Sequence, residues 1–221
     1  MSIWQITGFT LFTASVATLL MLPPGIAIGW LLARRRFPGR VLLETLVSLP
    51  LVMPPVATGL ILLMLVAPAG PIGRLLARAG IEVVFTWKAV VLAMAVMGLP
   101  LVVRSVRAGV EQVDHRFEAV ASTLGAAPLR VFITVTVPLA LPGILAGAVL
   151  GFARALGEFG ATIMVAGSIP GSTRTLAVAI YSFAETGRED DAVTLVVICG
   201  VIAFAALWVS NWLSSRTGLR A

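Results

Sequence analysis

The chain contains five apolar runs that are each long enough to cross a lipid bilayer, and this feature limits its possible folds most strongly. A spanning helix needs about 20 predominantly apolar residues. The runs occupy approximately 11–32, 45–66, 88–108, 139–165 and 192–212. Only 12% of the residues are charged, against about a quarter in a typical soluble domain. We therefore expect an all-α membrane protein in which residues 1–221 form one domain with five transmembrane helices.

Positive charge is distributed unequally between the two sides that five spans would create. One side carries ten arginines, namely Arg34, Arg35, Arg36, Arg40, Arg104, Arg107, Arg116, Arg130, Arg216 and Arg220. The other side carries Arg74, Arg78, Lys88, Arg174 and Arg188. Because lysine and arginine collect in cytoplasmic loops, the pattern predicts an external N-terminus and a cytoplasmic C-terminus. The connection 111–138 is then cytoplasmic, and a short stretch at 176–183 could form a helix at the outer interface.

Several classes of function are excluded by the same sequence. The arginines flank apolar runs and do not alternate with exposed aromatic residues, which argues against a nucleic-acid partner. His115 and Cys199 are the only residues of their types, so neither a metal-ligand spacing nor a Cys–His pair exists. The sole lysine, Lys88, is followed by Ala89, so the phosphate-binding G-x-x-x-x-G-K-S/T loop is missing. We expect a chain that is not an enzyme, binds no metal or cofactor, and takes its driving energy from a partner.

Prolines interrupt the apolar runs, most densely at Pro54 and Pro55. A proline removes a backbone donor and kinks a helix, and the freed carbonyl needs a partner from another helix or a wet cavity. These kinks, with the nearby hydroxyl of Thr58, favour a bundle that lines a pathway and moves. The simpler interpretation is that proline is common in membrane helices.

A pair of opposite charges lies inside the fourth run. Arg154 and Glu158 are four residues apart, which places both on one face of a helix. Gly157 and Gly160 beside them are small enough to let another backbone approach closely. One interpretation is that this face lines a translocation path and presents Arg154 to an anion. The other is a structural ion pair that fixes helix packing.

The cytoplasmic connection shows a helix–turn–helix pattern. Asp114 can cap a helix that ends near Leu124, with an apolar stripe at helical spacing. Gly125 suits a helix end that needs a positive φ, and Pro128 suits the first turn of a second helix. The predicted loop is compact, amphipathic and exposed.

This loop resembles the coupling loop of the type I importer permeases of the ATP-binding-cassette superfamily. Their pattern is Glu-Ala-Ala, three residues, Gly, nine residues, then Ile-x-Leu-Pro. When the family pattern is aligned on Gly125, its Glu-Ala-Ala triplet falls on residues 119–121, so Glu118 lies one residue before the position of the family's glutamate. The Ile-x-Leu-Pro ending of the pattern corresponds to Val135-x-Val137-Pro138. The resemblance implies that the ATPase is contacted by Glu118, Ala119, Ala121, Leu124, Gly125, Pro128, Leu129, Arg130 and Pro138.

Other stretches are similar to molybdate permeases in particular. They are 36–39, 49–55, 123–125, 154–162 and 169–175, of which the Gly-Glu-Phe-Gly stretch at 157–160 is shared with sulfate permeases. The resemblance implies two copies of the chain in the bacterial cytoplasmic membrane. It also implies two ATPase subunits that use ATP and Mg²⁺, and a periplasmic or lipid-anchored oxyanion-binding protein. A molybdate or tungstate permease is favoured, with a sulfate or thiosulfate permease and a self-contained anion channel or carrier as alternatives.

Overall fold

The computed structural model describes residues 2–216, except for the side chains of 210, 211 and 213–216. Every regular element in this range is helical. The α-helices are α1 (Ile3–Arg34), α2 (Arg40–Val52), α3 (Pro55–Val66), α4 (Pro71–Arg78), α5 (Trp87–Glu111), α6 (His115–Thr123), α7 (Pro128–Val131), α8 (Val137–Leu139), α9 (Leu141–Leu156), α10 (Gly160–Ala166), α11 (Leu176–Glu185) and α12 (Glu189–Arg216). A π-helical segment, Phe132–Thr136, joins α7 to α8. The all-helical prediction is confirmed.

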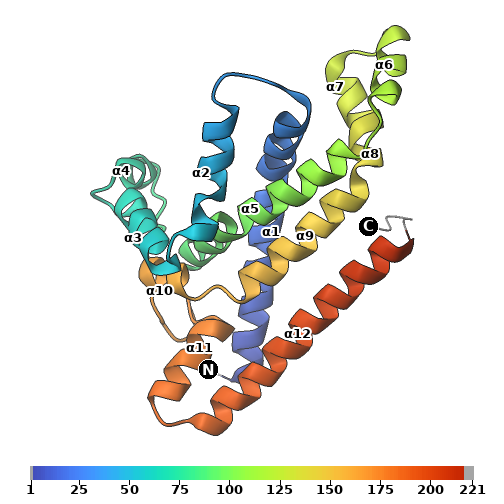
Figure 1. Ribbon diagram of the computed structural model, residues 1–221. Helices are drawn as coiled ribbons and strands as arrows, with labels where there is room; N and C mark the ends of the chain where they lie inside the picture. Colours follow the sequence, from blue (N-terminus) through green and yellow to red (C-terminus); the bar gives the residue numbers. More distant parts are fainter. Residues whose placement is uncertain (1, 217–221) are drawn as a thin grey trace.

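Helices α1, α5 and α9 form the centre of the bundle (Figure 1). Small residues allow their backbones to approach closely, as is usual between membrane helices. A Cβ atom added to Gly25 of α1 would lie 2.6 Å from Val102 of α5. One added to Gly109 of α5 would lie 2.8 Å from the Cα of Gly143 on α9. Any larger residue at these contacts would push the helices apart.

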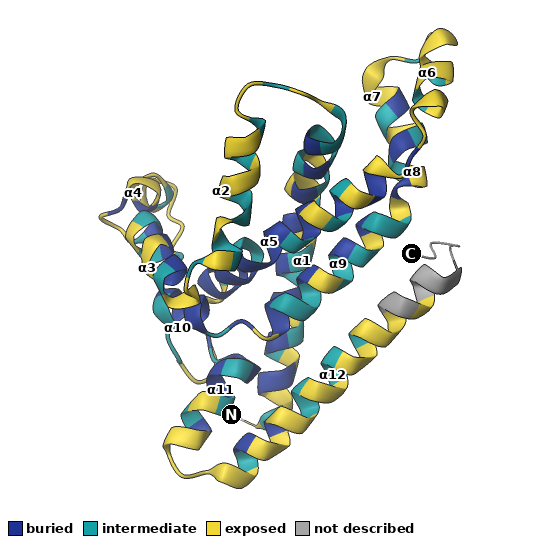
Figure 2. Ribbon diagram, viewed as in Figure 1, coloured by how far each residue is buried: buried dark blue, intermediate teal, exposed yellow. Residues whose placement is uncertain are grey.

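The lipid-facing character expected from composition is visible on α12, which is coloured largely as exposed in Figure 2. Its exposed side chains include Val201, Phe204 and Trp208, which are 63%, 72% and 63% exposed. Large apolar side chains in such numbers are tolerated on an outer face only where lipid or another chain covers them. The helix therefore presents a surface suited to a bilayer.

Three helices are long and apolar enough to cross a membrane by themselves, α1, α5 and the described part of α12. They contain the predicted runs 11–32, 88–108 and 192–212. Helix α1 is longer than expected, since it begins at Ile3 and stays helical through Pro23 and Pro24.

The predicted runs 45–66 and 139–165 are not single helices, and this is a correction. The first is the pair α2 and α3, bent by 115° at Met53 and Pro54. The second breaks after Leu156, and α10 begins again at Gly160. Within the described residues, the structure gives five spans only if each bent pair of helices counts as one span. One bent pair is α2 with α3, and the other is the segment Pro128–Leu139 with α9, which are bent by 71° relative to each other. The sequence pattern located the apolar residues correctly but could not show these breaks.

Candidate functional site

The loop between α5 and α9 has the helix–turn–helix form that the sequence predicted. The Asp114 side chain caps α6 by accepting a 2.9 Å hydrogen bond from the backbone N–H of Arg116. Gly125 has a φ of +85°, in the left-handed region that side chains with a Cβ avoid. Pro128 is the first residue of α7. Local sequence therefore determines both helices and the turn between them.

The loop lies at the end of the molecule farthest from α11 (Figure 1), and several of its apolar side chains are exposed. Phe117, Val120, Leu124 and Leu129 are 58%, 58%, 83% and 69% exposed. Exposed leucine and phenylalanine side chains on a short helix are costly in water unless a partner covers them. The exposed faces of α6 and α7, with Ala119 and Arg130, form what we call the docking face.

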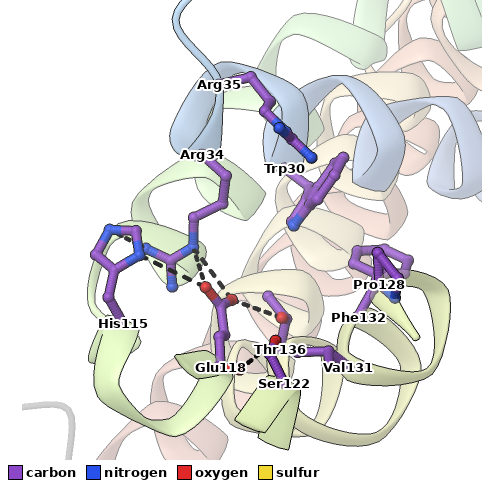
Figure 3. A pocket seen from close by; sticks show the side chains of 10 residues that line it. All are labelled: Trp30, Arg34, Arg35, His115, Glu118, Ser122, Pro128, Val131, Phe132 and Thr136. Atoms are coloured by element: carbon purple, nitrogen blue, oxygen red, sulfur yellow. Dashed lines mark hydrogen bonds and ion pairs between the residues drawn. The ribbon is translucent and has the colours of Figure 1, made fainter. Parts of the chain in front are cut away.

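Glu118 does not point toward the docking face but back toward α1, where it joins a polar network (Figure 3). Its carboxylate lies 3.2 Å from Nε of Arg34 and accepts a 2.6 Å hydrogen bond from Oγ1 of Thr136. Arg34 also donates to the carbonyl of Val113 at 2.8 Å and lies 3.0 Å from Nε2 of His115. The Arg34 and Glu118 side chains are only 6% and 18% exposed. We call this contact the Arg34–Glu118 bridge.

The bridge borders a cavity of about 300 Å³ between the end of α1 and the loop. On its other side, the ring of Trp30 on α1 meets that of Phe132 edge-on at 5.3 Å. The loop is therefore attached to α1 by one ionic and one aromatic contact. Sequence reasoning missed the role of Arg34, which it counted only as one of several cytoplasmic charges. The residues are 84 positions apart, and no local pattern could have paired them.

The intramembrane charge pair exists, but its geometry differs from the prediction. Nη1 of Arg154 lies 2.7 Å from Oε2 of Glu158, whose side chain is 1% exposed. Glu158 is not on the same helix, because α9 ends at Leu156 with Gly157 as its cap. Its other oxygen accepts a 2.8 Å hydrogen bond from the backbone N–H of Ala161 in the first turn of α10. The pair therefore bridges a helix break instead of sharing one helix face.

The two glycines beside this pair behave differently. A Cβ added to Gly160 would lie 2.7 Å from Cβ of Pro55, so α10 and α3 pack closely there. A Cβ added to Gly157 would meet no atom within 4 Å. The predicted close approach is present at Gly160, whereas Gly157 meets no neighbour within the described chain and caps the end of α9.

Two buried hydroxyls lie in the helices that meet at this break. Thr58 of α3 is 7% exposed and Thr162 of α10 is 0% exposed. Among the described residues, neither Oγ1 atom has a hydrogen-bond partner. A buried polar atom without a partner costs free energy, so these hydroxyls remain available to a ligand or water. Thr58 lies in the first turn of α3, where its backbone N–H donates to the carbonyl of Pro54.

Helices of membrane-spanning length together with an exposed docking face fit a membrane protein that binds a partner at one end. The chain belongs to the family described as the binding-protein-dependent transport system inner membrane component, whose model matches residues 25–217. The resemblance inferred from the loop is thus confirmed, and the chain is an inner-membrane transport permease component.

Named relatives are similar along nearly the whole chain. The molybdenum transport system permease protein ModB of Escherichia coli K12 is 47% identical over 220 residues, covering 99% of this chain and 96% of that protein. The protein of the same name from Haemophilus influenzae is 46% identical over 211 residues, covering 95% and 92%. The sulfate transport system permease protein CysT of Salmonella typhimurium is 38% identical over 211 residues, covering 96% and 76%.

Solved structures confirm the fold of this class. A chain of a bacterial ABC transporter that imports alginate superposes with a TM-score of 0.73 at 17% identity, covering 97% of this chain and 79% of that one. A chain of the MetNI methionine ABC transporter in inward-facing conformations gives 0.63 at 19% identity, covering 96% and 94%. Both are chains of ABC transporters, and the first is described as involved in import, so the fold of this chain is that of an ABC importer permease.

Proposed function

We propose that the chain is the permease subunit of an ATP-driven importer that moves molybdate, or the chemically similar tungstate, across the inner membrane. The observation that carries this proposal is the 47% identity to a molybdenum transport permease over 99% of the chain. The sulfate permease is less similar and extends well beyond this chain. Sulfate is also a tetrahedral dianion and is therefore the second candidate substrate.

The assembly that we propose has two copies of the chain, two ATPase subunits and an external binding protein. The exposed docking face supports the ATPase contact, since none of the residues that the structure describes covers it. A second copy is supported by α2, which contains no buried residue although it is apolar. A binding protein is supported by family membership, and a related alginate transporter was solved with its periplasmic protein bound.

In this proposal, the Arg34–Glu118 bridge transmits movement from the ATPase to the spans. Glu118 contacts α1 inside its own chain, so its role is to hold the loop rather than to touch the ATPase. Closure of the ATPases on ATP would move the two loops together, and α1 would move with its loop. The exposed residues Leu124, Leu129 and Arg130 remain to contact the partner.

We also propose that the Arg154–Glu158 pair stabilises the break between α9 and α10. Each charge is neutralised by the other, and Glu158 caps α10 through Ala161. A pair with both partners engaged offers an anion little net charge. The pathway would pass beside this break, along Pro54 and Pro55.

Transport by the complete complex tests the proposal. The permease, its ATPase and the loaded binding protein are reconstituted in vesicles, and ATP-dependent uptake of radiolabelled molybdate is measured. We expect uptake that excess tungstate suppresses and equal sulfate does not. Preferential sulfate uptake would identify the second candidate, and ATP-independent uptake would indicate a self-contained carrier.

The orientation of the chain is tested by labelling. A cysteine at Ala126, in a variant whose Cys199 is replaced by alanine, is offered to an impermeant thiol reagent. We expect labelling in inside-out vesicles and none in whole cells. Labelling in whole cells would place the loop outside and exclude the coupling mechanism.

A further inference from the structure

Thr136 uses its hydroxyl differently from the other threonine of its helical segment. A helical threonine can donate to the carbonyl three or four residues earlier, as Thr134 does to Arg130 at 2.6 Å. Thr136 instead donates to Oε1 of Glu118, 18 positions away, at 2.6 Å. This length is typical of a hydroxyl bound to an ionised carboxylate. The contact is therefore a charge-assisted hydrogen bond between two elements of the loop.

The π-helical segment Phe132–Thr136 explains why this hydroxyl is available. The carbonyl four residues before Thr136 is that of Phe132, and it accepts the π-helical hydrogen bond from the backbone N–H of Val137. Thr136 is 1% exposed, so its hydroxyl has little access to water. Single π-helical turns are rare and are found frequently at functional sites. In this one, the Thr136 hydroxyl is directed away from its own helix and toward Glu118.

Glu118 is connected to two membrane-spanning elements because of this contact. Arg34, in the last turn of α1, lies with its Nε 3.2 Å from the carboxylate. Thr136 ends the π-helical segment, which continues through α8 into α9. Figure 3 shows the Arg34 and Thr136 side chains meeting at the same carboxylate. One acid on α6 therefore joins the loop to α1 and to the helix that leads into α9.

The two donors fix the orientation of the carboxylate. Its oxygens accept hydrogen bonds and donate none when the group is ionised, and the Glu118 side chain is only 18% exposed. Removing the Thr136 hydroxyl would leave this acceptor one donor short where water is largely excluded, which costs more than losing an exposed bond. The segment would still be attached to α1, because Phe132 packs edge-on against Trp30. Loss of this hydroxyl therefore affects Glu118 more than the path of the chain.

We propose that Thr136 is the positioning residue of Glu118, and that their hydrogen bond extends the coupling path from α6 to α9 as well as to α1. This inference rests on the proposed function, in which the Arg34–Glu118 bridge transmits movement of the ATPase. Movement of the docking face would then shift two spanning elements together and not α1 alone. Because Thr136 is buried, it acts through Glu118 and not by contact with the ATPase.

Two substitutions at this position separate the hydroxyl from the packing. Thr136→Val keeps the shape of the side chain and removes the donor, whereas Thr136→Ser keeps the donor and removes a methyl group. Thr134→Val, at the exposed threonine of the same segment, is the matched control. Each full-length permease is measured alone in detergent by hydrogen exchange of the α6 amides. It is then measured in vesicles with saturating ATPase and loaded binding protein, as molybdate ions imported per ATP hydrolysed.

We expect Thr136→Val to speed exchange of the α6 amides about tenfold or more, the effect of losing a hydrogen bond to a charged group. The same variant should import fewer ions per ATP, because the loop moves without carrying α9 with it. Thr136→Ser and Thr134→Val should match the wild type in both measurements. A role in packing alone predicts the opposite order, since serine loses the buried methyl group and valine keeps it.

Three results would overturn the inference. They are a Thr136→Val variant that behaves like the wild type, a Thr136→Ser variant impaired as much as Thr136→Val, and faster exchange with an unchanged number of ions per ATP. Hydrogen exchange depends on neither the ATPase nor the transported ion. If wild-type vesicles import sulfate and not molybdate, the proposed substrate fails separately, and the transport measurement is made with sulfate.

Discussion

The Arg34–Glu118 bridge makes the most informative single prediction, because two roles for Glu118 lead to opposite results. If Glu118 holds the loop against α1, then removing Arg34 should harm ATPase binding as much as removing Glu118. If Glu118 instead contacts the ATPase, the Arg34 change should matter little. The variants are Arg34→Gln, Glu118→Gln and the double substitution, with Arg36→Gln as the matched control.

The size of the effect follows from burial. Breaking a fully buried ion pair costs about 3–5 kcal/mol, and an exposed pair contributes about 0–1 kcal/mol. With side chains 6% and 18% exposed, this pair lies between the two, at about 2 kcal/mol. That free energy corresponds to about a 30-fold change in an equilibrium constant. If only the ordered loop binds the ATPase, the apparent Kd should rise by up to this factor.

The assay is the equilibrium affinity of the detergent-solubilised permease for its ATPase. We expect both single variants to weaken binding by a similar factor and the double variant to be no weaker than either, because the three changes remove one interaction. Arg36→Gln should bind like the wild type. Additive losses, or an Arg34→Gln variant with wild-type affinity, would refute the proposed role of the bridge.

Three further predictions follow from the same geometry. Gly125→Val places a β-branched residue at a φ of +85°, which should cost about 1–3 kcal/mol of local strain and reduce recovery of the ATPase in pull-down experiments. The control is Gly80→Val, at a φ of +69° on the predicted external side of the membrane, which should leave recovery unchanged. Equal losses in the two variants would contradict the placement of the loop. Leu124→Asp, at a position 83% exposed, should abolish ATPase binding without shifting the thermal midpoint; retained binding would exclude it from the docking face. Glu158→Gln leaves Arg154 without its carboxylate and should destabilise the fold by about 3–5 kcal/mol, seen as a lower midpoint in thermal unfolding; an unchanged midpoint would show that the pair is not structural.

Much of the fold could be predicted from the sequence because its signals are local. Apolar runs located the spanning helices, and Asp114, Gly125 and Pro128 located the two helices of the loop and the turn between them. Each of these residues acts through its own backbone or its nearest neighbours. The same locality explains why the short helix α11 was anticipated at 176–183.

Tertiary contacts explain what could not be predicted. The break after Leu156 is accompanied by Glu158 capping α10 through the backbone N–H of Ala161. The 115° bend between α2 and α3 depends on the packing of α3 against α10 as well as on proline. The Arg34–Glu118 bridge appears only when distant helices are brought together. Helical periodicity carries no information about such partners.

Cross-linking from the docking face tests the central claim most directly. A photoreactive amino acid replaces Leu124 in the assembled complex, which is irradiated in native membranes with and without ATP. The account predicts an adduct with the ATPase subunit, whose yield changes when ATP is added. An absent ATPase adduct in an assembled, transport-competent complex would contradict the claim that this loop couples the permease to its motor.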